Sequence, residues 1–265
     1  MNDINEVAAL SVTGLQKSFG GVQAVRGASF AVPAGQVCAL IGPNGAGKST
    51  AVGLIAGALR ADGGQVRLHG ADITGWPANR VARAGLIRTY QLSREFGRLT
   101  VLENLMVTPF GQAGESLGNV FARPRRVRAE EQRHLDRARE VLATFGLYDL
   151  RDSYARELSG GQKRLLELAR SVMASPRMLL LDEPMAGINP ALIDRIGEHI
   201  LGLAGGGVTV LMVEHNLGVV ERICDHVIVM AEGDTLATGS MAELRANPAV
   251  VRAYLGGALS DSASG

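Results

Sequence analysis

A glycine-rich segment near the N-terminus carries the clearest chemistry in this sequence. The stretch GPNGAGKST, residues 42–50, fits the pattern G-x-x-x-x-G-K-[S/T], with a strand-like apolar segment before it and a helical segment after it. Glycines let successive backbone N–H groups turn toward phosphate oxygens, and the start of the helix adds positive potential. Lys48 can bridge phosphate oxygens, and the Ser49 hydroxyl can ligate Mg²⁺. The pattern predicts a nucleoside triphosphate site made of Asn44, Gly45, Ala46, Gly47, Lys48, Ser49 and Thr50.

Two carboxylates end the apolar run MLLLDEP at residues 178–184. Asp182 suits a Mg²⁺ contact, either direct or through water, and Glu183 suits the base that polarises an attacking water. Two acids at the end of a strand are often only a solvated edge. Here the apolar residues before them favour a buried strand that directs the pair into a binding crevice. We therefore predict that Asp182 and Glu183 serve hydrolysis.

A second pair of glycines, Gly160 and Gly161, stands where an amphipathic helix begins in ARELSGGQKRLLELARSVM, residues 155–173. Ser159, the two glycine N–H groups and the positive end of that helix can seat an anion. The stretch has no P-loop lysine of its own, because Lys48 lies more than a hundred residues upstream. The pattern predicts a phosphate seat outside the P-loop and its lysine, and it raises the question of whose phosphate the seat holds.

Three single residues are weaker signals. His215 ends the apolar run VLMVEH, Gln91 lies in IRTYQLSREFGRLTVLENL, and Phe19 lies beside two glycines in KSFGGVQAV. A histidine at a strand end can be catalytic, a glutamine can offer its carbonyl oxygen to Mg²⁺ or to the attacking water, and an aromatic at a turn can stack on a base. Each also has a plain structural explanation, as a capping histidine, an ordinary loop glutamine or a core aromatic.

The elements that must position these residues alternate between strands and helices. Residues 10–37 show short alternating apolar stretches broken by glycine turns, which indicates antiparallel strands. Strand-length apolar runs then alternate with helical patterns, which predicts parallel βαβ units with a binding site at the strand carboxyl ends. The pattern lapses in residues 109–127, and a charged amphipathic helix follows at 128–147. This indicates a mostly helical lobe inserted into an α/β core.

The composition argues against several classes of protein. Of the 265 residues, 46% are hydrophobic and 20% are charged, as in ordinary globular proteins. A net charge of +1 argues against a nucleic-acid partner, and no apolar run reaches the roughly 18 residues of a membrane span. The first residues lack a secretory signal pattern, so we expect a cytosolic location. Cys38 and Cys224 lack metal-ligand spacing and are expected to be small buried hydrophobes.

In their order along the chain, Phe19, GPNGAGKST, Gln91, LSGGQ, LLLDEP and His215 closely resemble the nucleotide-binding subunit of ABC transporters, over about residues 10–255. The resemblance implies an α/β fold with a P-loop NTPase (RecA-like) core, an N-terminal antiparallel β subdomain and an inserted α-helical subdomain. It implies a single nucleotide-binding domain at 7–256. The small, polar residues at the C-terminal end separately predict a disordered tail at 257–265. Within the domain, the β and RecA-like core would take residues 7–90 and 174–256, and the helical subdomain would take 91–173.

The same resemblance implies roles for single residues. Phe19 would stack on the base of ATP, Glu183 would be the catalytic base, and His215 would be the switch histidine. Gln91 would be the Q-loop residue and would serve catalysis. Residues 185–190, MAGINP, would form the D-loop.

Two further sets of residues follow from the resemblance. Ser49, Gln91 and Asp182 would surround Mg²⁺. The signature motif would act in trans, on ATP bound by another subunit, through Ser159, Gly160, Gly161 and Gln162. That arrangement would answer the question of the missing lysine, because the lysine would belong to a partner chain.

Longer stretches narrow the resemblance to the ATPases of branched-chain amino-acid importers. They include DEPMAGINP, VEHNLGVV and the ending VVRAYLG, and the long insert before the signature resembles the larger of the two ATPases in such importers. Two residues depart from common ABC patterns, because Phe19 stands where many members have tyrosine and Met185 stands where threonine or serine is commoner. Phenylalanine still stacks on a base and Met185 is a spacer, so neither departure affects the predicted nucleotide site.

The resemblance also implies cofactors, partners and a location. ATP and Mg²⁺ would be bound between this chain and a second homologous ATPase, or a second copy of the chain. Two integral-membrane permease subunits and, indirectly, a periplasmic solute-binding protein would complete the importer on the cytoplasmic face of the inner membrane. Urea or amide import, lipopolysaccharide extraction and a non-transport ABC ATPase in DNA or translation processes stay open as alternatives. The solute rests on the resemblance alone.

Overall fold

The computed structural model describes residues 8–89, 95–110, 112, 122 and 124–261. The chain divides into two compact units, one of residues 1–88 and 177–265 and the other of residues 89–176. The first unit carries the P-loop and the acidic strand end, and the second carries the SGGQ motif. The helical insert expected at 91–173 falls inside the second unit.

An antiparallel sheet forms the N-terminal part of the first unit. Its order is β2-β1-β4-β5, with β1 at Ala8–Phe19, β2 at Val22–Pro33, β4 at Gly63–Leu68 and β5 at Ala71–Asp72. Strands β1 and β2 form a hairpin, which confirms the antiparallel strands expected at 10–37. The two glycines at its turn, Gly20 and Gly21, have φ angles of 51° and 89°, a region that glycine enters without strain.

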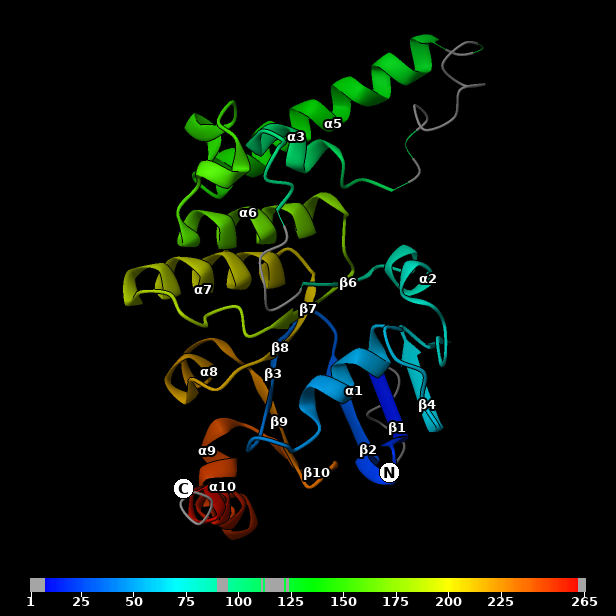
Figure 1. The fold of residues 1–265 in the computed structure, drawn as a ribbon, viewed down its shortest axis with the longest axis vertical. Coiled ribbons are helices and arrows are strands. Elements are labelled where there is room, and N and C mark those ends of the chain that lie inside the picture. Colours follow the sequence, from blue (N-terminus) through cyan, green and yellow to red (C-terminus); the bar gives the residue numbers. More distant parts are fainter. Residues whose placement is uncertain (1–7, 90–94, 111, 113–121, 123, 262–265) are drawn as a thin grey trace. The chain divides into compact units, whose positions relative to one another are not determined.

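A six-stranded sheet forms the centre of the same unit (Figure 1). Neighbouring strands from β9 through β3, β8 and β7 to β6 are parallel, and β10 pairs antiparallel with β9. Every residue of β3, β7 and β8 is buried, as expected for parallel strands covered on both faces. In chain order the strands are β3 (Val37–Ile41), β6 (Leu86–Arg88), β7 (Met178–Asp182), β8 (Thr209–Val213), β9 (His226–Ala231) and β10 (Asp234–Gly239).

Helices cover both faces of the central sheet. Helix α1 (Lys48–Ile55) lies between the two sheets, while α7 (Pro190–Gly205) and α8 (Leu217–Ile223) lie on the opposite face of the central sheet (Figure 1). The unit also contains the helices α2 (Ala78–Arg83), α9 (Met241–Ala246) and α10 (Pro248–Asp261).

One hydrophobic core joins α1 to the two sheets. Val52 and Ile55 of α1 belong to the same buried cluster as Leu15 of β1, Leu40 of β3 and Leu180 of β7. The core therefore fixes α1, and with it the end of the P-loop, against the central sheet. Because β3, β7 and β8 are parallel neighbours, the loops after all three strands leave the same edge of the sheet.

The second unit is helical over its described residues. It contains α3 (Val101–Met106), α5 (Pro124–Thr144), the short 3-10 helices η2 (Tyr148–Leu150) and η3 (Ala155–Glu157), and α6 (Gly160–Met173). Helices α3, α5 and α6 pack on one another. The fully buried amide of Asn104 donates to the carbonyl oxygens of Phe96 and Thr100 and accepts from the Phe96 N–H group. This side chain ties the segment before α3 to the helix.

The predicted fold class is confirmed, but two predicted boundaries are wrong. Helix α5 begins at Pro124 rather than at residue 128, because proline fits the first position of a helix and arginine is a good helix former. Helix α10 continues to Asp261, so the expected disorder is wrong for residues 257–261. The side chain of Asn247 accepts from the Ala249 N–H group at 2.9 Å and caps α10. Residues 262–265 lie outside the described residues.

Candidate functional site

The P-loop connects β3 to α1, and two glycines permit its path. Gly42 has a φ of 152°, and a Cβ atom there would lie 2.1 Å from the carbonyl oxygen of Met230 in β9. Gly47 has a φ of 93°, and a Cβ atom there would lie 2.3 Å from the carbonyl oxygen of Ala24 in β2. No side chain fits at either distance, so the loop can lie against β2 and β9 only with glycine at these positions.

Backbone hydrogen bonds brace the loop from behind. The Gly233 N–H group, in the turn between β9 and β10, donates to the carbonyl oxygen of Ala46 at 3.2 Å. The Arg26 N–H group of β2 in turn donates to the Gly233 carbonyl oxygen at 2.7 Å. Ala46 is buried, while Asn44, Gly45 and Ser49 are exposed and Thr50 is half-buried. The predicted nucleotide-binding residues therefore form an outward-facing loop on a fixed base.

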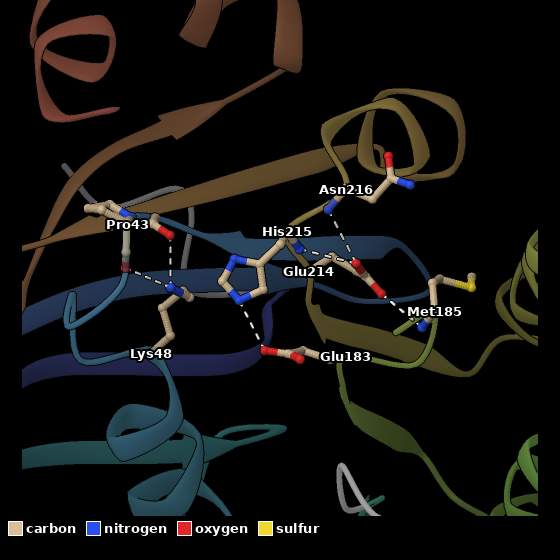
Figure 2. Close-up of polar contacts among 8 residues, drawn as sticks. Pro43, Lys48, Glu183, Met185, Glu214, His215 and Asn216 are labelled. Atoms are coloured by element: carbon tan, nitrogen blue, oxygen red, sulfur yellow. Dashed lines mark hydrogen bonds and ion pairs between the residues drawn. The ribbon is translucent and has the colours of Figure 1, made fainter. Parts of the chain in front are cut away.

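Lys48, the first residue of α1, is 6% exposed. Its ammonium donates to the carbonyl oxygens of Gly42 and Pro43, both at 2.8 Å (Figure 2). Burial lowers the pKa of Lys48, and the negative charge of Glu183 opposes that shift. An ammonium has three N–H donors, so Lys48 can close the loop and still bond a phosphate oxygen.

Asp182, the last residue of β7, forms a part-buried ion pair with Arg88 at the end of β6. The Arg88 Nη2 atom lies 2.9 Å from Asp182 Oδ2, and the two side chains are 14% and 10% exposed. The parallel pairing of β6 with β7 brings the two residues together. Sequence reasoning missed this pair, because the partner is distant in sequence and belongs to a three-residue strand. A carboxylate has two oxygens, so Asp182 can accept from Arg88 and also ligate a cation.

Glu183 and His215 form a direct contact at the ends of β7 and β8. The His215 Nε2 atom lies 3.0 Å from Glu183 Oε1. Figure 2 shows the two side chains pointing toward one another. Glu183 has a φ of 49°, a left-handed conformation that costs about 1–3 kcal/mol for a residue with a side chain. Strain of this kind persists only where surrounding contacts impose it, and it is concentrated at functional sites.

Glu214 is a site residue that the sequence analysis missed. It follows β8 directly, is 4% exposed, and accepts backbone N–H groups from Met185, His215 and Asn216 at 2.9, 3.1 and 3.4 Å (Figure 2). Burial raises the pKa of Glu214, the three N–H groups lower it, the Glu183 charge raises it further, and the net shift is upward. The sequence signal was a charged residue directly after the apolar run VLMV and directly before the predicted switch histidine.

Phe19 lies at the tip of the β1–β2 hairpin. Its side chain is 46% exposed, and the Lys17 ammonium lies 5.4 Å from the centre of the ring. The core-aromatic explanation is therefore wrong. The ring is instead an exposed flat surface.

The signature residues begin α6, in the second unit. Ser159 and Gln162 form a capping box, in which Gln162 N–H donates to Ser159 Oγ at 3.3 Å and Ser159 N–H donates to Gln162 Oε1 at 2.8 Å. The φ of Gly160 lies outside the left-handed region, and a Cβ atom there would meet nothing within 4 Å. Glycine costs about 1 kcal/mol relative to alanine in a helix. Neither backbone conformation nor packing in this chain accounts for glycine at position 160.

The structure thus places Lys48, Asp182, Glu183 and His215 of the first unit at one edge of its central sheet. Gln91 lies outside the described residues. Among the described residues no three His, Cys, Asp or Glu side chains gather as a metal site. The Ser49 hydroxyl and the Asp182 carboxylate are nevertheless oxygen ligands of the kind that Mg²⁺ prefers.

No helix in the described part of the chain has both the length and the apolar character needed to cross a membrane.

Comparison with known proteins gives two family matches. Residues 25–186 match the family described as ABC transporter, and residues 235–259 match the family described as branched-chain amino acid ATP-binding cassette transporter. The second match covers most of β10, all of α9 and most of α10.

Individual relatives match over almost the whole chain. The probable branched-chain amino acid transport ATP-binding protein LivG of Archaeoglobus fulgidus is 39% identical over 247 residues, which cover 93% of this chain and 95% of the relative. The high-affinity branched-chain amino acid transport ATP-binding protein BraF of Pseudomonas aeruginosa is 40% identical over 249 residues, which cover 93% and 97%.

Two solved structures are similar in both sequence and fold. A nucleotide-free ATP-binding cassette from an ABC transporter superimposes with a TM-score of 0.80 at 36% identity, covering 93% of this chain and 98% of the other. An ATP-binding cassette of an ABC transporter in its ADP conformation superimposes with a TM-score of 0.79, also at 36% identity, covering 94% and 99%.

Proposed function

Because the chain belongs to the ABC transporter family of ATP-hydrolysing subunits, we propose that it powers a membrane importer of branched-chain or other hydrophobic amino acids. The match of residues 235–259 to the branched-chain family supports this solute class, as do the LivG and BraF relatives, which are named as branched-chain amino acid transport proteins. The observation that carries the hydrolytic role is the contact between Glu183 and His215 beside the P-loop lysine.

Glu183 is the general base in the proposed reaction. A water oxygen attacks the γ-phosphorus of ATP, Glu183 accepts the water proton, and the bond from the γ-phosphorus to the bridging oxygen breaks, which leaves ADP and phosphate. His215 holds the Glu183 carboxylate through the 3.0 Å contact. A fixed carboxylate aligns the water better than a mobile one, because misplacement of reacting groups by about 1 Å can cost about 100-fold in rate.

Lys48 and the P-loop hold the phosphates. The outward-facing loop offers backbone N–H groups, and the Lys48 ammonium already lies against the Gly42 and Pro43 carbonyl oxygens. The exposed ring of Phe19 is the surface on which the adenine base stacks.

Ser49 and Asp182 fit Mg²⁺ as oxygen ligands, with Gln91 as the third predicted ligand. When bound with ATP, Mg²⁺ neutralises charge that develops on the phosphates. The Arg88 contact holds the Asp182 carboxylate at the end of β7.

The signature motif receives the γ-phosphate of ATP bound by another subunit. The open space around Gly160 supports this proposal, because a glycine that its own chain does not require is explained by the close approach of a partner's phosphate. Ser159 and Gln162 fix the start of α6, so the helix N-terminus presents its N–H groups in a set direction. Two ATPase subunits therefore close around ATP and separate after hydrolysis.

The partners follow from that cycle. Closure of the ATPase pair is transmitted to two integral-membrane permease subunits. A second homologous ATPase or a second copy of this chain completes the pair, and a periplasmic solute-binding protein delivers the solute. The chain then lies at the cytoplasmic face of the inner membrane as a peripheral subunit.

Reconstituted transport tests the proposal. Vesicles that contain the permease pair and both ATPases, with ATP inside and the solute-binding protein outside, are expected to accumulate radiolabelled leucine. The same vesicles with Lys48→Ala in this chain are expected to lose that uptake. Uptake of urea in place of leucine would overturn the solute class, and ATP-independent uptake would overturn the role of the chain.

A further inference from the structure

Glu214 is a buried carboxylate to which the reaction described above gives no role. It is 4% exposed, and among the described residues no lysine, arginine or histidine forms an ion pair with it. Its negative charge is instead met by the N–H groups of Met185, His215 and Asn216. A buried charge held by backbone donors from two separate turns costs free energy that an apolar side chain would not cost, so its retention calls for an explanation.

One oxygen of Glu214 holds the turn that contains the base. The Met185 N–H group donates to Glu214 Oε1 at 2.9 Å. The same turn is closed by Ala186 N–H, which donates to the Glu183 carbonyl oxygen at 3.1 Å, and Glu183 N–H donates to the Val213 carbonyl oxygen at 3.0 Å. These three bonds surround Glu183 and impose its left-handed φ of 49°.

The other oxygen of Glu214 holds the turn that contains the histidine. The N–H groups of His215 and Asn216 donate to Glu214 Oε2 at 3.1 and 3.4 Å. Asn216 then caps α8 through its own side chain, which accepts from Gly218 N–H at 3.1 Å. The backbone of His215 is therefore fixed between the Glu214 carboxylate and the start of a helix.

We propose that Glu214 is a positioning residue that couples the two turns, and that it sets the distance between the Glu183 carboxylate and the His215 ring. Figure 2 shows the resulting closed circuit, from Glu183 through Met185 to Glu214, on to His215, and back to Glu183. Because Met185 lies in the predicted D-loop, the coupling also makes the base respond to movement of that loop. The inference rests on the proposed function of Glu183 as the base.

Replacing Glu214 by glutamine changes the charge and the hydrogen-bond acceptors of the side chain but keeps its shape. In Glu214→Gln the amide keeps the size of the carboxylate and one acceptor oxygen. Its NH₂ group is a donor, so it cannot accept the N–H groups of the turn that it faces. One of the two turns therefore loses its acceptor. The side chain still fills the same space, so packing of the core is preserved.

The test is the ATPase activity of the full-length chain, measured in the wild-type and Glu183→Gln backgrounds. We expect Glu214→Gln to lower kcat about 10- to 100-fold, with ATP affinity changed by less than about threefold. In the Glu183→Gln background we expect Glu214→Gln to cause no further loss of the residual activity, because its effect passes through the base. Glu198→Gln, at an exposed position on α7, is the matched control and is expected to retain wild-type kcat.

Three results would overturn the coupling: wild-type kcat in Glu214→Gln, an equal loss in both backgrounds, or loss of ATP binding together with kcat. Should the glutamine variant fail to fold, Glu214→Asp keeps the charge but shortens the reach to the two turns, and the same pattern of kcat loss with retained ATP binding is expected. Wild-type ATPase activity that persists in Glu183→Gln would instead overturn the proposed base, and it would do so whatever Glu214 does.

Discussion

The Nε2 atom of His215 lies 3.0 Å from the Oε1 atom of Glu183, across the ends of two adjacent parallel strands. The strand register explains the contact, because Asp182 of β7 pairs with Val213 of β8 and the chain leaves both strands at the same level. Residues 183 and 215 therefore meet although they are far apart in sequence. The negative charge of Glu183 acts to raise the pKa of Lys48. One sheet edge therefore carries the lysine proposed to bind phosphate, the proposed base and the histidine that contacts that base.

Gly160→Asp tests whether the signature motif acts on a partner's ATP. The structure leaves room for the new side chain, and an acid at a helix N-terminus favours the helix, so the variant is expected to fold and to bind ATP at its own P-loop. Its carboxylate would repel a γ-phosphate brought by the partner, and we expect hydrolysis by the assembled pair to fall about 100-fold or more.

Gly160→Ala is the matched control and is expected to keep more activity than the aspartate variant. The measurements are ATP binding by the isolated chain and phosphate release by the pair. Loss of ATP binding in isolated Gly160→Asp would contradict action in trans.

Arg88→Met tests the part-buried ion pair behind the nucleotide site. Removal of the guanidinium leaves the 10% exposed carboxylate of Asp182 without this partner, and we expect a loss of about 3 kcal/mol in the free energy of unfolding. Arg222→Met is the control, because the Arg222–Asp194 pair is half-exposed and such surface pairs contribute about 1 kcal/mol or less. Urea unfolding measures both. Equal losses in the two variants would contradict a special role for burial at Arg88.

The two cysteines give a prediction for high pH. Burial raises the pKa of Cys38 and Cys224 from 9.0 to about 12, so between these pH values the folded chain keeps thiol protons that the unfolded chain loses. Titration of the two thiols should therefore leave the free energy of unfolding unchanged below about pH 9, and it should lower that free energy as the pH rises above 9. We expect a steeper decline in the wild-type chain than in Cys38→Ala/Cys224→Ala, measured by unfolding at pH 8 and pH 10. Identical slopes would show that the thiols do not titrate differently on folding.

Local patterns predicted the elements of this fold better than they predicted its contacts. The P-loop, the buried strand before Asp182 and the helix start at Ser159 are each encoded in a few consecutive residues, so they could be recognised directly. The Arg88–Asp182 pair and the contacts of Glu214 depend on the register of β6, β7 and β8, which is set by packing of segments far apart in sequence. The left-handed backbone of Glu183 was also beyond sequence reasoning, because glutamate has no preference for that conformation and the neighbouring turns impose it.

Helix ends were the other limit of the sequence analysis. Helix α5 begins at Pro124, before its predicted start at residue 128, and α10 runs through Gly256 and Gly257 into the tail expected to be disordered. Proline is harmless at a first helical position, and a glycine weakens a helix by only about 1 kcal/mol. Neither residue alone could therefore fix the boundary.

Phosphate release by Glu183→Gln, measured beside ATP binding by the same full-length protein, tests the central claim most directly. The amide cannot accept the proton of the attacking water, but it leaves Lys48 and the P-loop intact. We predict ATP affinity within about threefold of wild type and a turnover at least about 100-fold lower. Wild-type turnover with normal ATP binding would contradict the assignment of Glu183 as the base.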